Sequence, residues 1–368
     1  MPPWCWNVSC DTTWTEPKRL AGIEISLLRQ LMAKSPPDAI NLALGELGFS
    51  FPEILANHAR DLLIAPKPAY TANAGIMELR QRIARDYGTG ANSVCVCNGA
   101  EEALYIAMQA LIEPGDIVAI PDPDYPAYPA LAGLASAEVI RLPFEPDFCN
   151  IEWDIWRCKL MGVKALLMSS PSNPSGYCIS REDSVRLAEI TRQTGTVLIV
   201  DEIYREVYCE QPELPDWNQF DRLIRIGGVS KSHLMSGWRI GWIQAPDSFI
   251  NSATKLKQYI STCPPWLSQK LALYALDCPE VPEDVRTQMR ENHKYIKQAF
   301  ASHQIHLPPA SPYALLKVTD SLKQAEKYLR QGVITVPGIA FGNSTKEYVR
   351  INYAVERELL CRALGRIL

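Results

Sequence analysis

The chain has 368 residues, of which 47% are apolar and 21% charged, the profile of an ordinary globular protein with room for two domains. Its formal net charge of −4 gives no electrostatic reason to expect nucleic acid or an anionic membrane as a partner. No run of about 18 apolar residues occurs, and the N-terminus lacks a basic leader before an apolar stretch, so we expect neither a membrane span nor a signal peptide. Eleven scattered cysteines, without paired spacings typical of zinc sites, favour reduced thiols in the cytoplasm and no bound metal.

Short β-rich runs alternate with helical patterns from about residue 94 onward. Helices are expected at 100–112 and at 182–195, where Gly195 is a typical stop signal. Strands are expected at 94–97, 116–121, 137–144, 164–170, 196–202, 222–228 and 239–245. Because these strands are nearly continuous apolar runs between helices, the pattern predicts an α/β fold whose mostly parallel seven-stranded sheet is covered on both faces.

The last part of the chain has a different pattern from about residue 266. Helical stretches come first, and a strand–loop–strand reading at 332–338 and 347–354 precedes a helix at 356–368. We expect a large domain over 46–265 and a smaller α+β domain formed by 1–45 together with 266–368.

Polar residues follow the expected strands at the point where each strand ends. They fall in the segments 98–100, 122–128, 171–176, 201–204 and 230–231. Ligands of open parallel sheets bind at the carboxyl ends of the strands. The sequence therefore predicts one ligand site built from these five segments.

The chemistry of these segments fits a cofactor that carries an aldehyde and a phosphate. Lys231 can form a Schiff base with an aldehyde, and Arg239 can hold a phosphate through its planar fork. Asp201 follows an apolar strand and needs a partner there, such as a protonated pyridine nitrogen. Asn173 lies in a proline-stiffened turn, and the free amides at the start of 100–112 can accept a phosphate. Taken singly, the same residues also fit plainer interpretations as surface charges, a helix cap or turn residues.

Several longer segments, in this order and spacing, resemble the fold-type I aminotransferases of classes I and II, the aspartate aminotransferase superfamily, which depend on pyridoxal 5′-phosphate (PLP). The segments are NLALGELGFSFPE, YTANAGIMELRQRIA, DPDYPAYPAL, PSNPSG, VDEIYREVY, SKSHLMSGWRIGW, VPGIAFG and YVRINYA. The resemblance covers nearly all of the chain, and it implies the two-domain fold of that family with PLP as cofactor.

The resemblance also implies roles around the cofactor. Lys231 should form the Schiff base and shuttle the substrate proton, and Asp201 should pair with the pyridine nitrogen. Tyr204 and Asn173 should hydrogen-bond the phenolate oxygen, and Tyr125 should stack on the ring. The groups implied to hold the phosphate are Ala100, Glu101, Ser230 and Arg239.

Substrate and partner roles follow from the same resemblance. Arg350 should bind the substrate α-carboxylate, helped by Asn173 and the backbone of Gly45. Tyr70 resembles the tyrosine that reaches the phosphate of the neighbouring subunit, which implies a homodimer.

The implied reaction moves the α-amino group of an L-amino acid to a 2-oxo acid through the Lys231 Schiff base and pyridoxamine phosphate. The same apparatus also supports C–S β-elimination, decarboxylation, racemisation or cyclisation of amino acids, and a non-catalytic PLP-binding sensor is a remote alternative. The chain departs from the family pattern at 45–49, at 311–314 and at Gly228, but none of these departures removes a catalytic group. The first two lie where the substrate side chain is set, so the sequence does not identify the amino acid.

Overall fold

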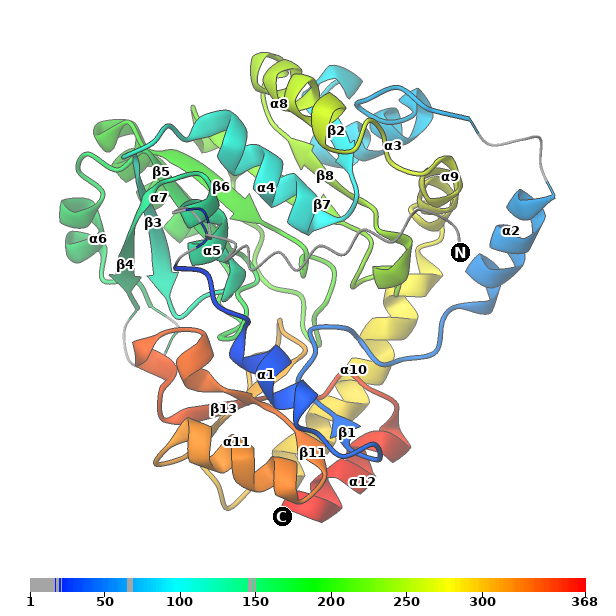
Figure 1. Cartoon of the computed structure of the whole chain (residues 1–368), viewed down its shortest axis with the longest axis vertical. Helices are drawn as coiled ribbons and strands as arrows, with labels where there is room; N and C mark the ends of the chain where they lie inside the picture. Colours follow the sequence, from blue (N-terminus) through cyan, green and yellow to red (C-terminus); the bar gives the residue numbers. More distant parts are fainter. Residues whose placement is uncertain (1–16, 18–19, 21, 65–68, 145–147, 149) are drawn as a thin grey trace, which may run out of the picture.

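The computed structural model describes residues 17, 20, 22–64, 69–144, 148 and 150–368. The seven predicted strands form one sheet, which confirms the α/β fold with its mostly parallel seven-stranded sheet (Figure 1). In spatial order they are β2 (Val94–Cys97), β8 (Gly241–Gln244), β7 (Leu223–Gly228), β6 (Val197–Asp201), β5 (Ala165–Ser169), β3 (Ile117–Asp122) and β4 (Glu138–Pro143). Only β8 among them runs antiparallel to its neighbours.

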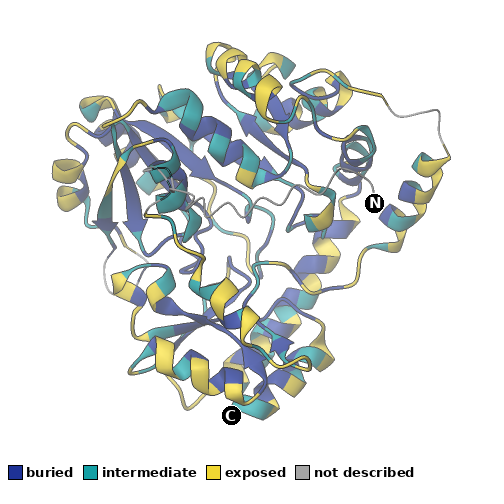
Figure 2. Cartoon of the chain, in the orientation of Figure 1, coloured by how far each residue is buried: buried dark blue, intermediate teal, exposed yellow. Residues whose placement is uncertain are grey.

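Both faces of this sheet are covered because its central strands are buried along their whole length and apolar at nearly every position. In β5, Leu167 packs on one face with helix α4, and Leu166 packs on the other face with helix α7. The helices of the first face are α4 (Ala100–Leu111), α5 (Ala127–Leu134) and α8 (Asp247–Ile260), and those of the second are α6 (Trp153–Lys159) and α7 (Arg181–Thr194). Figure 2 shows the sheet buried beneath helices whose outer faces are exposed.

Local sequence signals explain where these helices begin and end. The Ser180 hydroxyl accepts a hydrogen bond from the Asp183 amide, and the Asp183 side chain bonds back to Ser180, so α7 begins at a capping box. The helix stops at Gly195, whose positive φ of 72° suits a residue without a Cβ. Helix α4 begins at Ala100 after Gly99, which also has a positive φ.

A third group of helices packs at the β2 end of the sheet. These are α2 (Glu53–Leu63), α3 (Met77–Tyr87) and α9 (Trp266–Ala275). Their apolar side chains meet Val94, Val96 and Trp242.

The C-terminal part forms a smaller four-stranded antiparallel sheet in the lower half of Figure 1. Its strands are β12 (Val336–Pro337), β13 (Tyr348–Asn352), β10 (Tyr313–Lys317) and β9 (Ile305–His306), and its helices are α10 (Glu280–Ala299), α11 (Ser321–Arg330) and α12 (Arg357–Ile367). The N-terminal segment contributes α1 (Leu27–Ala33) and β1 (Ile40–Asn41), which pairs in parallel with β11 (Val333–Ile334).

The domain boundaries expected at 45/46 and 265/266 stay a prediction. No helix of the described residues is long and apolar enough to cross a membrane.

Candidate active site

The carboxyl ends of β3, β5 and β6 meet through buried hydrogen bonds. Asp124 accepts hydrogen bonds from the backbone and the hydroxyl of Ser169, and it accepts one from the Tyr125 amide at 2.7 Å. Burial raises the pKa of Asp124 to about 7, against the hydrogen bonds it accepts. Asp124 and Ser169 were not singled out from the sequence, although both lie at the strand ends that it marked.

Asp201 lies at the end of β6 and is fully enclosed. Its Oδ2 accepts a hydrogen bond from the Tyr128 hydroxyl at 3.1 Å, and its Oδ1 accepts one from the Ile203 amide at 3.0 Å. Burial raises the pKa of this carboxyl group to about 6. A cation beside Asp201 would offset that burial and keep the carboxylate ionised.

Lys231 follows β7 and is half-buried in the same region. Burial lowers the pKa of its amine to about 8, although the carboxylates of Glu46 and Asp201 act in the opposite direction. Its Nζ lies 5.9 Å from the centroid of the Tyr204 ring. Roughly a tenth of the amine is therefore neutral at pH 7, far more than for an ordinary lysine, and the neutral amine is the nucleophilic form.

Gly45 lets two phenols approach this lysine. A Cβ atom on Gly45 would lie 2.8 Å from the Tyr313 hydroxyl oxygen and 3.2 Å from that of Tyr204. The two hydroxyls form a short hydrogen bond with each other, and burial raises the pKa of Tyr204 well above its usual range. Tyr313, in the segment 311–314, is a site residue that the sequence marked only as a departure.

Arg350 of β13 points toward the large sheet from the smaller one. Its Nη1 donates to Asn173 Oδ1 at 2.7 Å, and its Nη2 donates to the Ala43 carbonyl. The guanidinium carbon lies 4.0 Å from the Tyr313 ring centroid and 4.8 Å from that of Phe341. Arg350 Nε is buried without a hydrogen-bond partner among the described residues, so the arginine keeps a donor for a bound anion.

The N-terminus of α4 forms a cradle with Arg239. The backbone of Arg239 is left-handed, and its Nη2 donates to the Asn98 carbonyl at 3.4 Å. A Cβ on Gly99 would meet this guanidinium at 2.5 Å, and a Cβ on Gly241 would meet the Ala100 amide nitrogen at 2.4 Å. Both glycines therefore permit the close approach of Arg239 and β8 to the start of α4, and sequence reasoning missed Gly241.

The remaining predicted residues divide into two groups. Tyr125 lies beside the cradle, where its hydroxyl donates to Glu101 Oε2 at 3.4 Å, and Ser230 is buried next to Lys231. Burial raises the pKa of Glu101. Tyr70, in contrast, is 89% exposed in the single chain.

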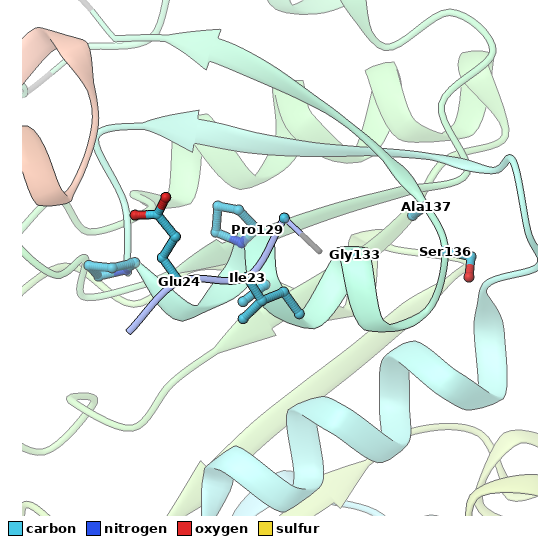
Figure 3. A pocket seen from close by; sticks show the side chains of 9 residues that line it. Ile23, Glu24, Pro129, Gly133, Ser136 and Ala137 are labelled. Carbon is cyan, nitrogen blue, oxygen red and sulfur yellow. The ribbon is translucent and has the colours of Figure 1, made fainter. Parts of the chain in front are cut away.

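A separate hollow of about 560 Å³ lies between residues 22–24 and α5 (Figure 3). Its walls include Ile23, Glu24 and Pro129, and none of the predicted site residues lines it. This hollow is therefore separate from the predicted site.

Comparisons with known proteins place this geometry in a family. The family described as aminotransferase class I and II matches residues 37–367. A probable aspartate aminotransferase of Methanocaldococcus jannaschii is 31% identical over 370 residues, with 95% of this chain and 98% of that protein covered. The crystal structure of the aspartate aminotransferase of Thermotoga maritima superposes with a TM-score of 0.89 at 29% identity, covering 96% of this chain and 98% of that one. The Thermus thermophilus aspartate aminotransferase solved with maleate gives a TM-score of 0.89 at 26% identity, over the same shares. This chain belongs to the class I and II aminotransferases, and it is an aminotransferase of the PLP-dependent kind.

Proposed function

We propose that this aminotransferase holds PLP through Lys231 and transfers the α-amino group of an L-amino acid to a 2-oxo acid. The observation that carries the proposal is the Lys231 amine, whose pKa burial lowers to about 8, in one cluster with Asp201 and Arg350. These three groups supply a nucleophile, a partner for a cationic ring and a partner for a carboxylate.

The α4 cradle has the donor set that a phosphate needs. The backbone amides at Ala100 and Glu101 start a helix of twelve residues, and the helix dipole favours an anion there. Arg239 and Ser230 add a guanidinium and a hydroxyl, and Arg239 is already fixed by bonds to Asn98 and Ser236.

The residues around Lys231 have the chemistry that the ring of the cofactor needs. Asp201 is a buried carboxylate whose raised pKa makes a cationic ring nitrogen a stabilising partner. Tyr204 and Asn173 are buried residues with groups that can donate hydrogen bonds, and Tyr125 offers an aromatic face for stacking.

PLP, when bound, supplies an aldehyde carbon for amines and a pyridine ring that takes up negative charge. Arg350 and Asn173 bind and orient the substrate α-carboxylate, using the donor that Nε keeps free. Lys231 Nζ takes the proton from the substrate α-carbon and would deliver it to the cofactor rather than back to that carbon, because its lowered pKa lets it act as base and acid near neutral pH. The buried tyrosines and Phe341 exclude water from this proton transfer.

We also propose a homodimer in which Tyr70 of each chain reaches the phosphate of the other. The support is that Tyr70 is an exposed aromatic, and that Leu63 and Ile64, earlier in the same stretch of chain, are 71% and 86% exposed. Exposed apolar side chains that gather in one region are typical of protein interfaces.

A reducing compartment such as the cytoplasm fits the cysteines. The eight that the structure describes are all free thiols, and Cys95, Cys97, Cys209 and Cys278 are buried. Thiol titration of the unfolded protein, isolated without reductant, should find all eleven cysteines reactive. Fewer thiols would contradict this compartment.

A single-turnover assay tests the reaction. The PLP-loaded protein is mixed with one L-amino acid at a time, without any 2-oxo acid, and the products are counted. We expect one donor class to release one 2-oxo acid per site with no ammonia or carbon dioxide. Release of ammonia with pyruvate, or of carbon dioxide, would instead identify a lyase or a decarboxylase.

A further inference from the structure

Lys257 is a fully buried lysine on the face of α8 that packs against α4. A buried ammonium is costly unless it is paired. Its Nζ donates to Ser261 Oγ at 2.8 Å and lies 3.6 Å from Glu102 Oε2. This ion pair links α8 to the first turn of α4, beside the proposed phosphate cradle.

Glu102 in turn holds the turn that leads into α4. Its Oε2 accepts a hydrogen bond from the Asn98 amide at 2.6 Å, and the Asn98 side-chain amide donates to both oxygens at 3.0 Å. On its other side, the Asn98 carbonyl accepts from Arg239. Burial alone would raise the pKa of Glu102, yet the hydrogen bonds from Asn98, then the Ser261 hydroxyl and the nearby Lys257 lower it below its usual value. The carboxylate therefore stays charged.

A charged Glu102 in this place has two opposite effects. It stabilises the helix N-terminus and fixes the turn 98–100, but it also repels a phosphate bound at the same N-terminus. Lys257 removes this conflict, because its ammonium cancels the charge of Glu102 while the hydrogen bonds to Asn98 remain.

We propose that Lys257 is a positioning residue for the phosphate site: through Glu102 it fixes the 98–100 turn and neutralises the carboxylate beside the bound phosphate. The affinity for PLP then depends on a residue of α8 that does not touch the cofactor. This inference rests on the proposed function, since it assumes a phosphate at the α4 N-terminus.

The test compares PLP with pyridoxal, which has the same ring and aldehyde but no phosphate. Dissociation constants of both are measured with the apo protein by absorption titration. Lys257→Met should weaken PLP binding roughly tenfold or more, because an unpaired carboxylate then faces the phosphate, while the pyridoxal constant stays unchanged. The matched control is Lys255→Met, an exposed lysine two residues earlier on α8, which should change neither constant.

A double-mutant cycle shows whether Lys257 acts through Glu102. In the Glu102→Gln background, Lys257→Met should change PLP affinity by less than about threefold, because no carboxylate is left to neutralise. If Lys257→Met fails to fold, Lys257→Gln, which keeps a donor for Ser261, takes its place in both comparisons.

The outcomes of these titrations distinguish a role in phosphate binding from a structural role and from no role. Equal losses for PLP and pyridoxal would show a merely structural role, and an unchanged PLP constant would show no role, so either result overturns the inference. A wild-type protein that binds neither compound overturns the proposed function itself.

Discussion

Two buried carboxyl groups, Asp201 after β6 and Asp124 after β3, lie on either side of the end of β5, and their electrostatics explain how the site selects a cationic ring. Burial raises the pKa of Asp201 to about 6 and that of Asp124 to about 7. In the apo protein, each carboxyl group therefore holds its proton to a higher pH than an aspartate in water does. A cationic group bound at Asp201 reverses this preference.

Asp201→Asn should stabilise the apo protein at pH 8 while it weakens PLP binding. The folded-state pKa of Asp201 is raised, so its stabilising contribution is complete below the ordinary aspartate pKa and is lost as the pH rises through about 6. The asparagine carries no charge, and the gain at pH 8 should be on the order of 2–3 kcal/mol.

Urea unfolding of both apo proteins at pH 5 and pH 8 measures this effect. Asp124 titrates in both proteins, and because the Asp201 charge helps to raise the pKa of Asp124, the difference between the proteins reports Asp201 together with this coupling. The exposed Asp221→Asn variant is the control. If the unfolding free energies of the wild-type protein and of Asp201→Asn changed by the same amount between pH 5 and pH 8, the raised pKa would not belong to Asp201.

Arg350→Ala should raise the KM for the amino acid while PLP stays bound. The guanidinium holds Asn173 and keeps a buried Nε donor, so its loss removes about 2 kcal/mol or more of carboxylate binding, a KM increase of roughly 30-fold. Steady-state kinetics and the cofactor absorbance of the same sample measure both effects. Arg330→Ala, an exposed arginine of α11, is the matched control, and loss of cofactor from Arg350→Ala would refute the role.

At the scale of elements, the large sheet could be predicted from the sequence because each strand is apolar at nearly every position. All seven strands were located within about two residues, and the helix stop at Gly195 was predicted correctly. The strands outside the large sheet were predicted only in part. Strands β9 and β1 have two residues each, and such short strands carry no periodicity of their own. Their pairing depends on partners far along the chain, as Ile40 pairs with Val333.

The candidate site shows the same division. Residues that follow a strand directly, such as Asp201 and Lys231, could be found from the sequence because the strand end marks them. Asp124, Tyr313 and Lys257 could not, since each acquires its meaning from a contact with a residue distant in the sequence. Asp124 meets Ser169, 45 positions later, and Lys257 meets Glu102 from another helix.

One contact between the large sheet and the smaller one invites a test of how loops position Arg350. The Asp122 carboxylate, at the end of β3, accepts hydrogen bonds from the Asn343 amide at 3.1 Å and the Ser344 hydroxyl at 2.6 Å. A Cβ on Gly342 would lie 2.0 Å from this carboxylate, so the loop fits closely around it. The preceding residue, Phe341, covers the Arg350 guanidinium.

Asp122→Ala should lower the free energy of unfolding by about 1–2 kcal/mol and raise the KM several-fold, with a smaller effect on kcat. The loss of the carboxylate leaves the 342–344 loop without its partner and loosens Phe341 over Arg350. Thermal unfolding and steady-state kinetics measure the two effects. The exposed pair Arg192–Asp221 serves for comparison, since Asp221→Ala should change stability by less than about 0.5 kcal/mol. Equal stability losses in the two variants would argue against a special role for Asp122.

At the scale of the whole molecule, the proposed dimer makes each site depend on two chains. Tyr70→Ala and Lys231→Ala chains should each be inactive or nearly so. When they are mixed and allowed to exchange, a hybrid dimer contains one site with both residues intact. Random pairing predicts that about a quarter of all sites recover.

Sedimentation and activity of the mixture, compared with each variant alone, measure this recovery. As a control, Lys231→Ala is mixed with the wild-type protein. The activity per wild-type chain should stay unchanged in this mixture, which excludes a gain caused by mixing or dilution alone. A dimeric mixture of two inactive variants without recovered activity would show that Tyr70 serves the site of its own chain, and an active Tyr70→Ala variant would show that it serves no site.

Covalent trapping of the cofactor tests the central claim most directly. The protein is loaded with PLP, reduced with borohydride, digested and mapped by mass spectrometry. The Lys231 amine, with its pKa lowered to about 8, predicts that the cofactor mass is found on the peptide containing Lys231 and is absent from the Lys231→Ala variant. Labelling of a different lysine, or of none, would contradict the assignment of this site.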